Sequence, residues 1–412
     1  MNLRDRLLRV SIGSDSQPHR DDARRDAAGP PLEALVEGQW LAFSGARCFV
    51  SEHSYSLDHV HGGEPLGDLL SVPPHEWQHL VSGSQELPFA AERALFIDTE
   101  TTGLARGAGT VAFMVGVGLY HGDAFVVRQY FMPDYADEMA LLDLLADDLI
   151  ASHGLVTFNG RSFDWPIIST RYTLSQREIP RTDEPHLDLL LVARRLWRRI
   201  LDSCALSALE TDVLGLRRTH DDVPGYLIPQ LYQDYLQFGH AKPMARVFYH
   251  NEIDILSMVS LATRMGRLLT DSETRCDDDC CDLVALGQLY ERLDRRAEAI
   301  ETYTLALEQL AGEDRALAQK CLSLLYKRME RFDEAMVLWQ AALDGDDVFA
   351  HVELAKQYEH RLRDYPAARE VVLAAIAKVD AGVTAEDQAA ADRQLEELHY
   401  RLDRLERRIA RM

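Results

Sequence analysis

Two carboxylates stand two residues apart in an otherwise apolar segment. Asp98 and Glu100 lie in ALFIDTE, residues 94–100, where β-branched and aromatic residues predict a strand. Side chains two positions apart leave the same face of a strand. Two carboxylates on a buried face are costly to desolvate unless a cation neutralises them. The pair therefore indicates a divalent metal site, and the alternative is an edge strand with a solvated acidic face.

Two further acids complete a possible set of metal ligands. Asp164 opens a helix predicted over 163–174, and Asp254 lies within a helix predicted over 244–269. Carboxylate oxygens suit Mg²⁺ or Mn²⁺, and several carboxylates can hold two ions about 4 Å apart. Two such ions favour in-line attack of water on phosphorus. The sequence therefore predicts that Asp98, Glu100, Asp164 and Asp254 bind metal and take part in phosphodiester hydrolysis.

These acids stand in motifs that resemble a known family. The settings DTETTGL, N-x-x-x-F-D and H-N-x-x-D resemble the three motifs of the DEDD exonuclease superfamily. Five blocks in order, within about residues 90–268, resemble the bacterial YprB-type ribonuclease H-like family: FIDTETTGLARGAGTVAFMVGVG, VTFNGRSFDWPII, HLDLLLVARRLWRR, VPGYLIPQLYQDYL and VFYHNEIDILS.

The resemblance implies both a fold and an activity. The fold is an α/β ribonuclease H-like domain over residues 91–270, with a mixed five-stranded sheet and flanking helices. The activity is that of an exonuclease with two Mg²⁺ or Mn²⁺ ions, usually acting 3′ to 5′ on single-stranded ends. DNA and RNA both stay open as substrates.

One position departs from the superfamily pattern. DEDD enzymes carry a Tyr four residues before the last Asp, or a His five before it, to handle the attacking water. Here the residue types are exchanged, because His250 lies four before Asp254 and Tyr249 lies five before it. On an unbroken helix, four residues leave His250 within about 40° of Asp254, whereas Tyr249 lies about 140° away. A histidine can act as a general base near neutral pH, so we favour His250 as catalytic and keep Tyr249 as the alternative.

Other residues near these motifs are candidates for binding a nucleic acid. Thr101, Thr102 and Leu104 follow the first strand, and we expect them to hold a terminal nucleotide. Asn159 ends the predicted strand over 155–159, and we expect Phe163 to stack on a base. Each of these residues has a packing role as its alternative.

Arginines and one further acid also stand near the motifs. Arg194, Arg195, Arg198 and Arg199 share one predicted helix, and Arg217 and Arg218 follow the next. They either guide phosphates toward the metals or pair with acids such as Asp202 and Glu210. Asp188, in HLDLL, is expected to cap a helix or support the site rather than to bind metal.

The elements that must position these residues follow from hydrophobic patterning. Strands are predicted over 94–100, 110–120, 123–132 and 155–159, and helices over 138–150, 163–174, 186–200, 205–214, 228–237 and 244–269. This order fits a ribonuclease H-type layer, although several other sheets share it. Residues 1–36 lack an apolar period and are predicted to be disordered. Residues 37–90 are expected to form a small extension packed on the nuclease domain, with a short strand pair near its start.

Residues 280–380 carry an internal repeat. Large, small and aromatic positions recur in the tetratricopeptide pattern, and a third copy is looser because Pro366 and a one-residue insertion interrupt it. An all-α tetratricopeptide-like repeat domain is predicted, with a generic helical bundle as the alternative. The positions are Leu286, Gly287, Tyr290, Ala299, Tyr303 and Ala306, then Leu322, Ser323, Tyr326, Ala335, Trp339 and Ala342, then Leu354, Ala355, Tyr358, Ala368, Val372 and Ala375.

The segment 384–412 follows the repeats with a heptad seam of apolar residues. Leu395, Leu398, Leu402, Leu405 and Ile409 are spaced alternately three and four apart. A helix that caps the repeats is expected, and dimerisation through a short coiled coil is the alternative. A protein partner is expected to bind through residues 280–412.

Composition limits the function classes. The 412 residues carry a formal charge of −23, so a broad basic surface for long nucleic acid is excluded. The sequence contains no apolar stretch of membrane-spanning length and no signal-peptide pattern, so a cytoplasmic protein without a membrane partner is expected.

Two other functions compete with the exonuclease. One is a catalytically weak or inactive ribonuclease H-like scaffold that acts through its repeat domain. Degenerate enzymes typically lose an acid, and all four are present here. The other is an endonuclease that acts on structured nucleic acid.

Overall fold

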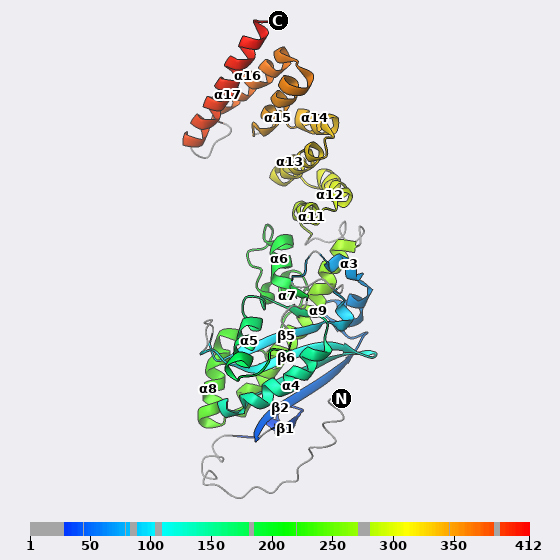
Figure 1. Ribbon diagram of the computed structural model, residues 1–412, viewed down its shortest axis with the longest axis vertical. Coiled ribbons are helices and arrows are strands. Elements are labelled where there is room, and N and C mark those ends of the chain that lie inside the picture. Colours follow the sequence, from blue (N-terminus) through cyan, green and yellow to red (C-terminus); the bar gives the residue numbers. More distant parts are fainter. Residues whose placement is uncertain are drawn as a thin grey trace, which may run out of the picture. The chain divides into compact units, whose positions relative to one another are not determined.

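The chain forms two compact units that meet in sequence between Cys281 and Asp282. A computed structural model (Figure 1) describes residues 29–43, 45–78, 80–82, 89–103, 109–180, 185–219, 221–270, 281–345, 347–382 and 388–412. No helix among these residues is long and apolar enough to cross a membrane. Most of the segment predicted to be disordered, residues 1–28, lies outside the description. Within its remainder, Leu32–Ala34 form a 3-10 turn (η1), and Leu32 is buried in the core.

The first unit contains one mixed sheet. Its strand order is β1-β2-β7-β6-β5-β8-β9, with antiparallel pairing from β1 to β5 and parallel pairing from β5 to β9. The strands are β1 (Gln39–Phe43), β2 (Ala46–Ser56), β5 (Leu95–Thr101), β6 (Ala112–His121), β7 (Ala124–Phe131), β8 (Leu155–Thr157) and β9 (His186–Asp188). The short strands β3 (Val60–His61) and β4 (Glu64–Pro65) pair separately.

The sheet has seven strands, so the expectation of five was wrong. The strand pair expected in the N-terminal extension joins the main sheet, because β2 pairs with β7 from Phe49↔Phe131 to Ser56↔Ala124. This pairing covers an edge of β7 that would otherwise expose unpaired backbone groups. The segment 186–200, predicted as one helix, begins with β9, which pairs with β8 before helix α6 starts at Leu189. Three residues are too few for an alternating pattern to distinguish a strand from the helix that follows.

Helices cover the sheet, and the long helix α9 bears the site residues His250 and Asp254. It packs against β5, β6 and β7, and the extension packs on it through β3, β4, α3 and the 3-10 helix η2 (Leu66–Ser71). Helix α4 packs against β1, β2 and β7. The helices of this unit are α3 (Pro74–Trp77), α4 (Glu138–Ala151), α5 (Asp164–Leu174), α6 (Leu189–Trp197), α7 (Leu206–Asp212), α8 (Ile228–Phe238) and α9 (Ala241–Thr270), with the turns η3 (Ala91–Arg93), η4 (Tyr135–Asp137) and η5 (Gly225–Leu227).

Glycines on β6 allow α9 to approach the sheet. Gly116 pairs with Asp98 on β5, and a Cβ at Gly116 would lie 2.1 Å from Oδ1 of Asn251 on α9. A Cβ at Gly118 would lie 2.6 Å from the Ile255 side chain. Real Cβ atoms do not approach other atoms so closely, so only glycine lets α9 bring its polar residues to β5.

The second unit is helical in its described residues. Small residues allow its helices to pair closely, as at Gly287, where a Cβ would lie 2.4 Å from the Tyr303 ring. Whether these pairs are tetratricopeptide-like repeats stays a prediction. The helices are α11 (Leu283–Arg292), α12 (Arg296–Gln309), α13 (Gly312–Arg328), α14 (Phe332–Ala341), α15 (Phe349–Gln357), α16 (Tyr365–Asp380) and α17 (Gln388–Ile409).

A π-helical turn lies where the third sequence copy carries its extra residue. Residues Tyr358–Leu362 form this turn (η6) at the end of α15, before α16 begins. A π turn is one residue wider than an α turn, so it accommodates an insertion without shifting the residues that follow. Ala368, Val372 and Ala375 are accordingly fully buried.

The heptad seam of α17 packs within its own chain. Leu398 and Leu405 are buried in a cluster with residues of α16, which α17 contacts along its length. Glu359, fully buried in η6, accepts hydrogen bonds from Arg401 at 2.9 Å and from Arg404 at 2.6 Å, both on α17. Helix α17 is therefore attached to the unit by apolar and charged contacts.

Candidate metal centre

Strand β5 carries two of the predicted metal ligands toward α9. Asp98 accepts a hydrogen bond of 2.8 Å from Asn251 Nδ2, and Gln129 Nε2 donates to Asn251 Oδ1 at 2.9 Å. The amide of Asn251 is therefore fixed with its donor toward Asp98. Glu100 is buried, and the β5–β6 register shifts directly after it.

Asp164 enters from the start of α5. It is buried and accepts a hydrogen bond from the Thr99 hydroxyl on β5. Burial raises the pKa of Asp164 to about 6, although the Thr99 hydrogen bond opposes this shift. The contact between β5 and α5 therefore holds a carboxyl group that is costly to ionise.

The charges on these acids oppose one another. Burial, followed by the charges of Asp254 and Asp164, raises the pKa of Asp98 well above its usual range. The pKa of Glu100 is raised in the same way, by burial and then by Asp98 and Asp254. Carboxylates this close together are stable in ionised form only when cations neutralise them.

Three residues could contribute ligand atoms to a single ion. One ligand atom each from Glu100, His250 and Asp254 lies within 4.8 Å of the other two. His250 Nε2 is 4.0 Å from Glu100 Oε1 and 3.6 Å from Asp254 Oδ2. Two carboxylates, one of them buried, with one imidazole nitrogen suit a divalent cation such as Mn²⁺ or Mg²⁺, so these residues fit the metal that the sequence implied.

The two candidates for handling water lie in different surroundings. His250 is directed at Glu100 and Asp254, and its Nδ1 is 2.6 Å from Asp222 Oδ1. The Tyr249 hydroxyl instead accepts a hydrogen bond of 3.1 Å from Thr219. Of the two side chains, His250 is the one that lies with the acids.

Sequence reasoning missed part of the site. Arg218 was considered only as a phosphate guide or as a partner of Glu210, yet it also donates to Asp254. Asp222, the partner of His250, was not considered. The run RRTHDD, residues 217–222, contains both residues, and its opposite charges beside an acidic site were the available signal.

The described residues among the predicted substrate-binding set make local hydrogen bonds or pack against the core. The Thr101 hydroxyl donates to the Gly103 carbonyl at 2.8 Å, and Thr102 Oγ1 accepts from the Val111 amide at 3.1 Å. Phe163 is partly buried against the core. Asn159 has a φ of 67° and donates its backbone N–H to Asp188. Leu104 lies outside the described residues.

Asp188 caps a helix, as the sequence predicted. Its Oδ1 accepts from the Leu190 amide at 3.1 Å, at the start of α6. The same side chain accepts from the backbone amides of Asn159 at 2.9 Å and Arg161 at 3.3 Å. Asp188 therefore fixes the loop that leads from β8 to Asp164.

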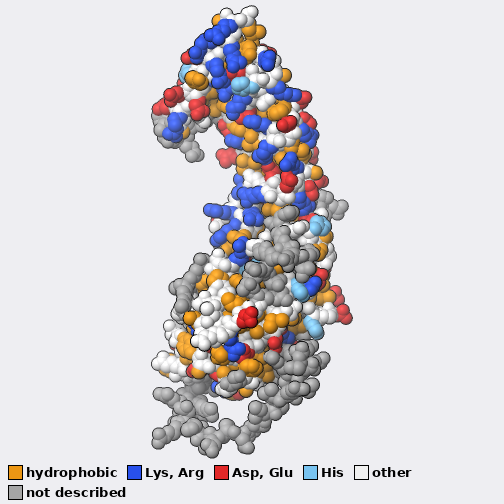
Figure 2. All heavy atoms as spheres, in the orientation of Figure 1, with side chains coloured by type: hydrophobic (Ala, Val, Ile, Leu, Met, Phe, Trp, Pro, Cys, Tyr) orange, Lys and Arg blue, Asp and Glu red, His pale blue; other side chains and the backbone are white. Residues whose placement is uncertain are grey.

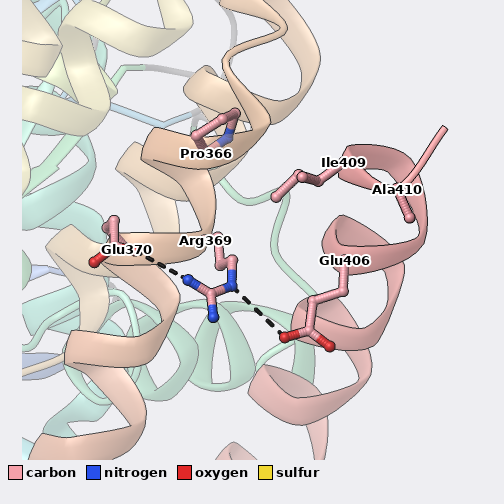
Figure 3. A pocket seen from close by; sticks show the side chains of 6 residues that line it. All are labelled: Pro366, Arg369, Glu370, Glu406, Ile409 and Ala410. Atoms are coloured by element: carbon pink, nitrogen blue, oxygen red, sulfur yellow. Dashed lines mark hydrogen bonds and ion pairs between the residues drawn. The ribbon is translucent and has the colours of Figure 1, made fainter. Parts of the chain in front are cut away.

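A cleft in the second unit differs from the metal centre, because its charged side chains form ion pairs with one another. It has a volume of about 330 Å³ and lies between α16 and α17. Arg369 is paired with Glu370 at 3.1 Å and with Glu406 at 3.6 Å, as Figure 3 shows. The charged groups of the cleft thus pair with one another.

The surface of the second unit carries charges of both signs. On the face drawn in Figure 2, Lys and Arg side chains are mixed with Asp and Glu over this unit.

The fold and the acidic site together define a ribonuclease H-like protein. The RNase_H superfamily model matches residues 95–266, from the start of β5 into α9. This superfamily generally hydrolyses nucleic acids and usually uses divalent metals.

A relative extends the comparison to most of the chain. The uncharacterized protein YprB of Bacillus subtilis (strain 168) is 32% identical over 374 residues, which cover 89% of this chain and 88% of the relative. The chain therefore belongs to the YprB family of ribonuclease H-like proteins.

Proposed function

We propose that the protein is a two-metal-ion-dependent exonuclease that hydrolyses phosphodiester bonds of DNA or RNA, 3′ to 5′, from single-stranded ends. The observation that carries this proposal is the group formed by buried Glu100 and partly buried His250 and Asp254. Membership of the ribonuclease H superfamily supports the reaction class.

Four acids would hold the ions. Asp98, Glu100, Asp164 and Asp254 are the candidates, with Glu100 and Asp254 near enough to share one ion. Bound Mg²⁺ or Mn²⁺ would supply the positive charge that activates water and stabilises the charge that develops on the phosphate. Asn251 and Thr99 orient Asp98 and Asp164, so both carboxyl groups are fixed before a substrate arrives.

His250 is the proposed general base. In the neutral ring with its proton on Nδ1, the Nε2 lone pair is directed at Glu100 and Asp254 and can accept a proton from water near them. Tyr249 would orient water from a greater distance. Replacement of His250 should therefore cost more activity than the change Tyr249→Phe.

The terminal nucleotide of the substrate would lie beside the carboxyl ends of β5 and β8. Thr101 and Thr102 follow Glu100 directly, and Asn159 and Phe163 belong to the loop that Asp188 fixes. We propose that these residues, with Leu104, hold the terminal nucleotides, with Phe163 stacked on a base.

A protein partner is proposed to bind through residues 280–412, most of which form the second unit. A cleft of about 310 Å³ supports this role, because apolar residues such as Phe349 and Leu398 line it. Its charges balance, since Lys320 pairs with Asp347 and Lys356 with Glu353, so a partner segment would be held mainly by apolar contacts.

The test is a substrate panel. Single-stranded and duplex DNA and RNA, labelled at either end, are incubated with the full-length protein and Mg²⁺ or Mn²⁺. We expect single-stranded 5′-labelled substrates to give a ladder of shortening products, and 3′-labelled ones to release labelled mononucleotide at once. Internal fragments would indicate an endonuclease. If no substrate is degraded, the scaffold alternative is favoured.

A further inference from the structure

Two charged residues in the segment between α7 and η5 contact the centre from one side. We propose that Asp222 and Arg218 are positioning residues: Asp222 holds the proton of His250 on Nδ1, and Arg218 takes one oxygen of Asp254. The remaining atoms, His250 Nε2 and Asp254 Oδ2, then stay turned toward Glu100. This inference rests on the proposed function, because it explains how the proposed metal centre is kept in order.

The contacts of His250 determine which ring nitrogen carries the proton. Nδ1 lies 2.6 Å from Asp222 Oδ1 and 3.1 Å from Arg218 Nη1. A carboxylate only accepts and a guanidinium only donates, so Nδ1 can bond to one of them at a time. The shorter contact is with the carboxylate, so Nδ1 donates to Asp222. In a neutral ring Nε2 then has a free lone pair, and this atom is the one 3.6 Å from Asp254 and 4.0 Å from Glu100.

The contacts of Asp254 divide its two oxygens. Oδ1 accepts a hydrogen bond from Arg218 Nη2, and Oδ2 is the oxygen that faces His250 Nε2. A carboxylate held at one oxygen cannot rotate freely, so the other oxygen has a fixed direction. His250 and Asp254 are thus each held at the atom that does not face the centre.

Arg218 is itself anchored in the fold. It donates to Glu210 through Nε at 2.7 Å and Nη2 at 2.6 Å, and the Glu210 side chain is only 2% exposed. The Ser257 hydroxyl on α9 donates to Glu210 at 2.6 Å, and His61 Nε2, on β3, lies 2.9 Å from that hydroxyl. The N-terminal extension therefore supports the arginine through His61, Ser257 and Glu210.

The pairing with Glu210 offers a variant without a change in net charge. The Arg218 guanidinium contacts Asp254, and its positive charge opposes the rise in the pKa of Asp98 and Glu100. By charge alone, its loss would strengthen the attraction of the acids for a cation, whereas loss of the hold on Asp254 would weaken binding. A variant that removes the charges of both Arg218 and Glu210 leaves the net charge of the protein unchanged, so weaker metal binding in that variant reports on orientation.

The first experiment measures Mn²⁺ affinity by electron paramagnetic resonance on the full-length protein. We expect the double variant R218Q/E210Q to bind Mn²⁺ about 10- to 100-fold more weakly than wild type, the usual cost of losing a group that orients a metal ligand. Arg217, an exposed neighbour, provides the control R217Q, which should bind like wild type. Unchanged affinity in the double variant would overturn the role of Arg218. Tighter binding would also overturn it, because it would mean that Arg218 competes with the metal.

The second experiment covers the case in which the double variant fails to fold. Asp222→Asn is isosteric at a side chain that is 20% exposed, so the fold should tolerate it. The new amide can donate to Nδ1 and so permit a proton on Nε2. Nitrogen NMR of ¹⁵N-histidine protein, with His250 assigned through H250Q, should show Nε2 unprotonated in the neutral wild-type ring and protonated in a substantial fraction of D222N. The control D221N changes an exposed acid and should match wild type.

These outcomes separate the two proposals. Wild type that binds no Mn²⁺ would contradict the metal-dependent function and this inference together. Wild type that binds Mn²⁺, with D222N unchanged in both tautomer and affinity, would overturn the role of Asp222 alone.

Discussion

The buried acids of the centre oppose folding when no cation is present. Each pKa unit by which a carboxyl group is raised on folding represents about 1.4 kcal/mol at a pH where it is ionised. Burial raises the pKa of Asp164 to about 6 from the ordinary value of 3.8. The folded protein therefore binds more protons than the unfolded chain between these pH values, so this residue makes stability fall as pH rises through that window.

The change Asp164→Asn should consequently stabilise the metal-free protein. The amide fits the same space and avoids the ionisation cost, so in EDTA at pH 7.5 the variant should be more stable by about 1 to 3 kcal/mol. The difference should shrink as pH falls from about 6 to about 4, because Asp164 is then protonated in wild type. Thermal or urea unfolding across this pH range measures it. A variant that is less stable than wild type at pH 7.5, or a difference that does not depend on pH, would contradict this explanation.

The relative positions of side chains could be predicted from the sequence where their spacing along one strand or one helix determines them. Asp98 and Glu100 share a face of β5 because side chains alternate along a strand, and His250 lies near Asp254 because four residues make about one helical turn. Arg218 and Asp222 belong to a segment without regular structure. No period predicts where such side chains point, so their contacts required the folded chain.

The close packing of α9 on β6 brings the polar residues of α9 to the acids of β5. Gly116 leaves space for Asn251, whose amide reaches Asp98 on the neighbouring strand. A glycine in the middle of a strand ordinarily weakens it, so its presence here indicates a close approach.

The change Gly116→Ala should displace Asn251 and disturb Asp98. The added methyl group overlaps the side chain of Asn251, so we expect a loss of about 1 to 3 kcal/mol in stability and weaker Mn²⁺ binding. Gly109 has open space around its Cβ position, and G109A is the matched control. Chemical denaturation and Mn²⁺ titration of both variants make the comparison, and a G116A protein equal to G109A in both would show that the approach is not needed.

Long elements were predictable, and short or irregular ones were not. The 30-residue helix α9 has a clear apolar period, and its predicted start at Met244 lies close to the observed start at Ala241. The strand β9 and the π turn η6 are each shorter than the window in which a period can be recognised. Strand β2 was expected, but its pairing with β7 depends on contacts distant in sequence.

At the scale of the whole molecule, a charge of −23 opposes contact with a polyanion. The proposed metal ions would bring positive charge to the acidic site around Glu100 and Asp254, so nucleic-acid binding should depend on them. The protein should therefore hold the end of a strand and should not bind along its length.

Binding of a single-stranded oligonucleotide should require a divalent metal and respond weakly to salt. With phosphorothioate linkages at the 3′ end to slow hydrolysis, we expect EDTA to reduce affinity at least about tenfold. The slope of log affinity against log salt should be shallower than about −3, because each phosphate neutralised on a single strand contributes about −0.7. Fluorescence anisotropy measures both. Tight binding in EDTA with a steep slope would instead indicate a basic surface.

The most direct test compares wild type with Glu100→Gln in the degradation of a 5′-labelled single-stranded oligonucleotide with Mn²⁺. Glutamine keeps the size of the side chain and removes the charge at the centre of the acidic group, so folding should persist while metal binding is impaired. We expect a ladder of shortened products from wild type and a rate at least about 100-fold lower from the variant. Degradation by the variant at the wild-type rate, or no Mn²⁺-dependent degradation by wild type, would contradict metal-dependent hydrolysis at this site.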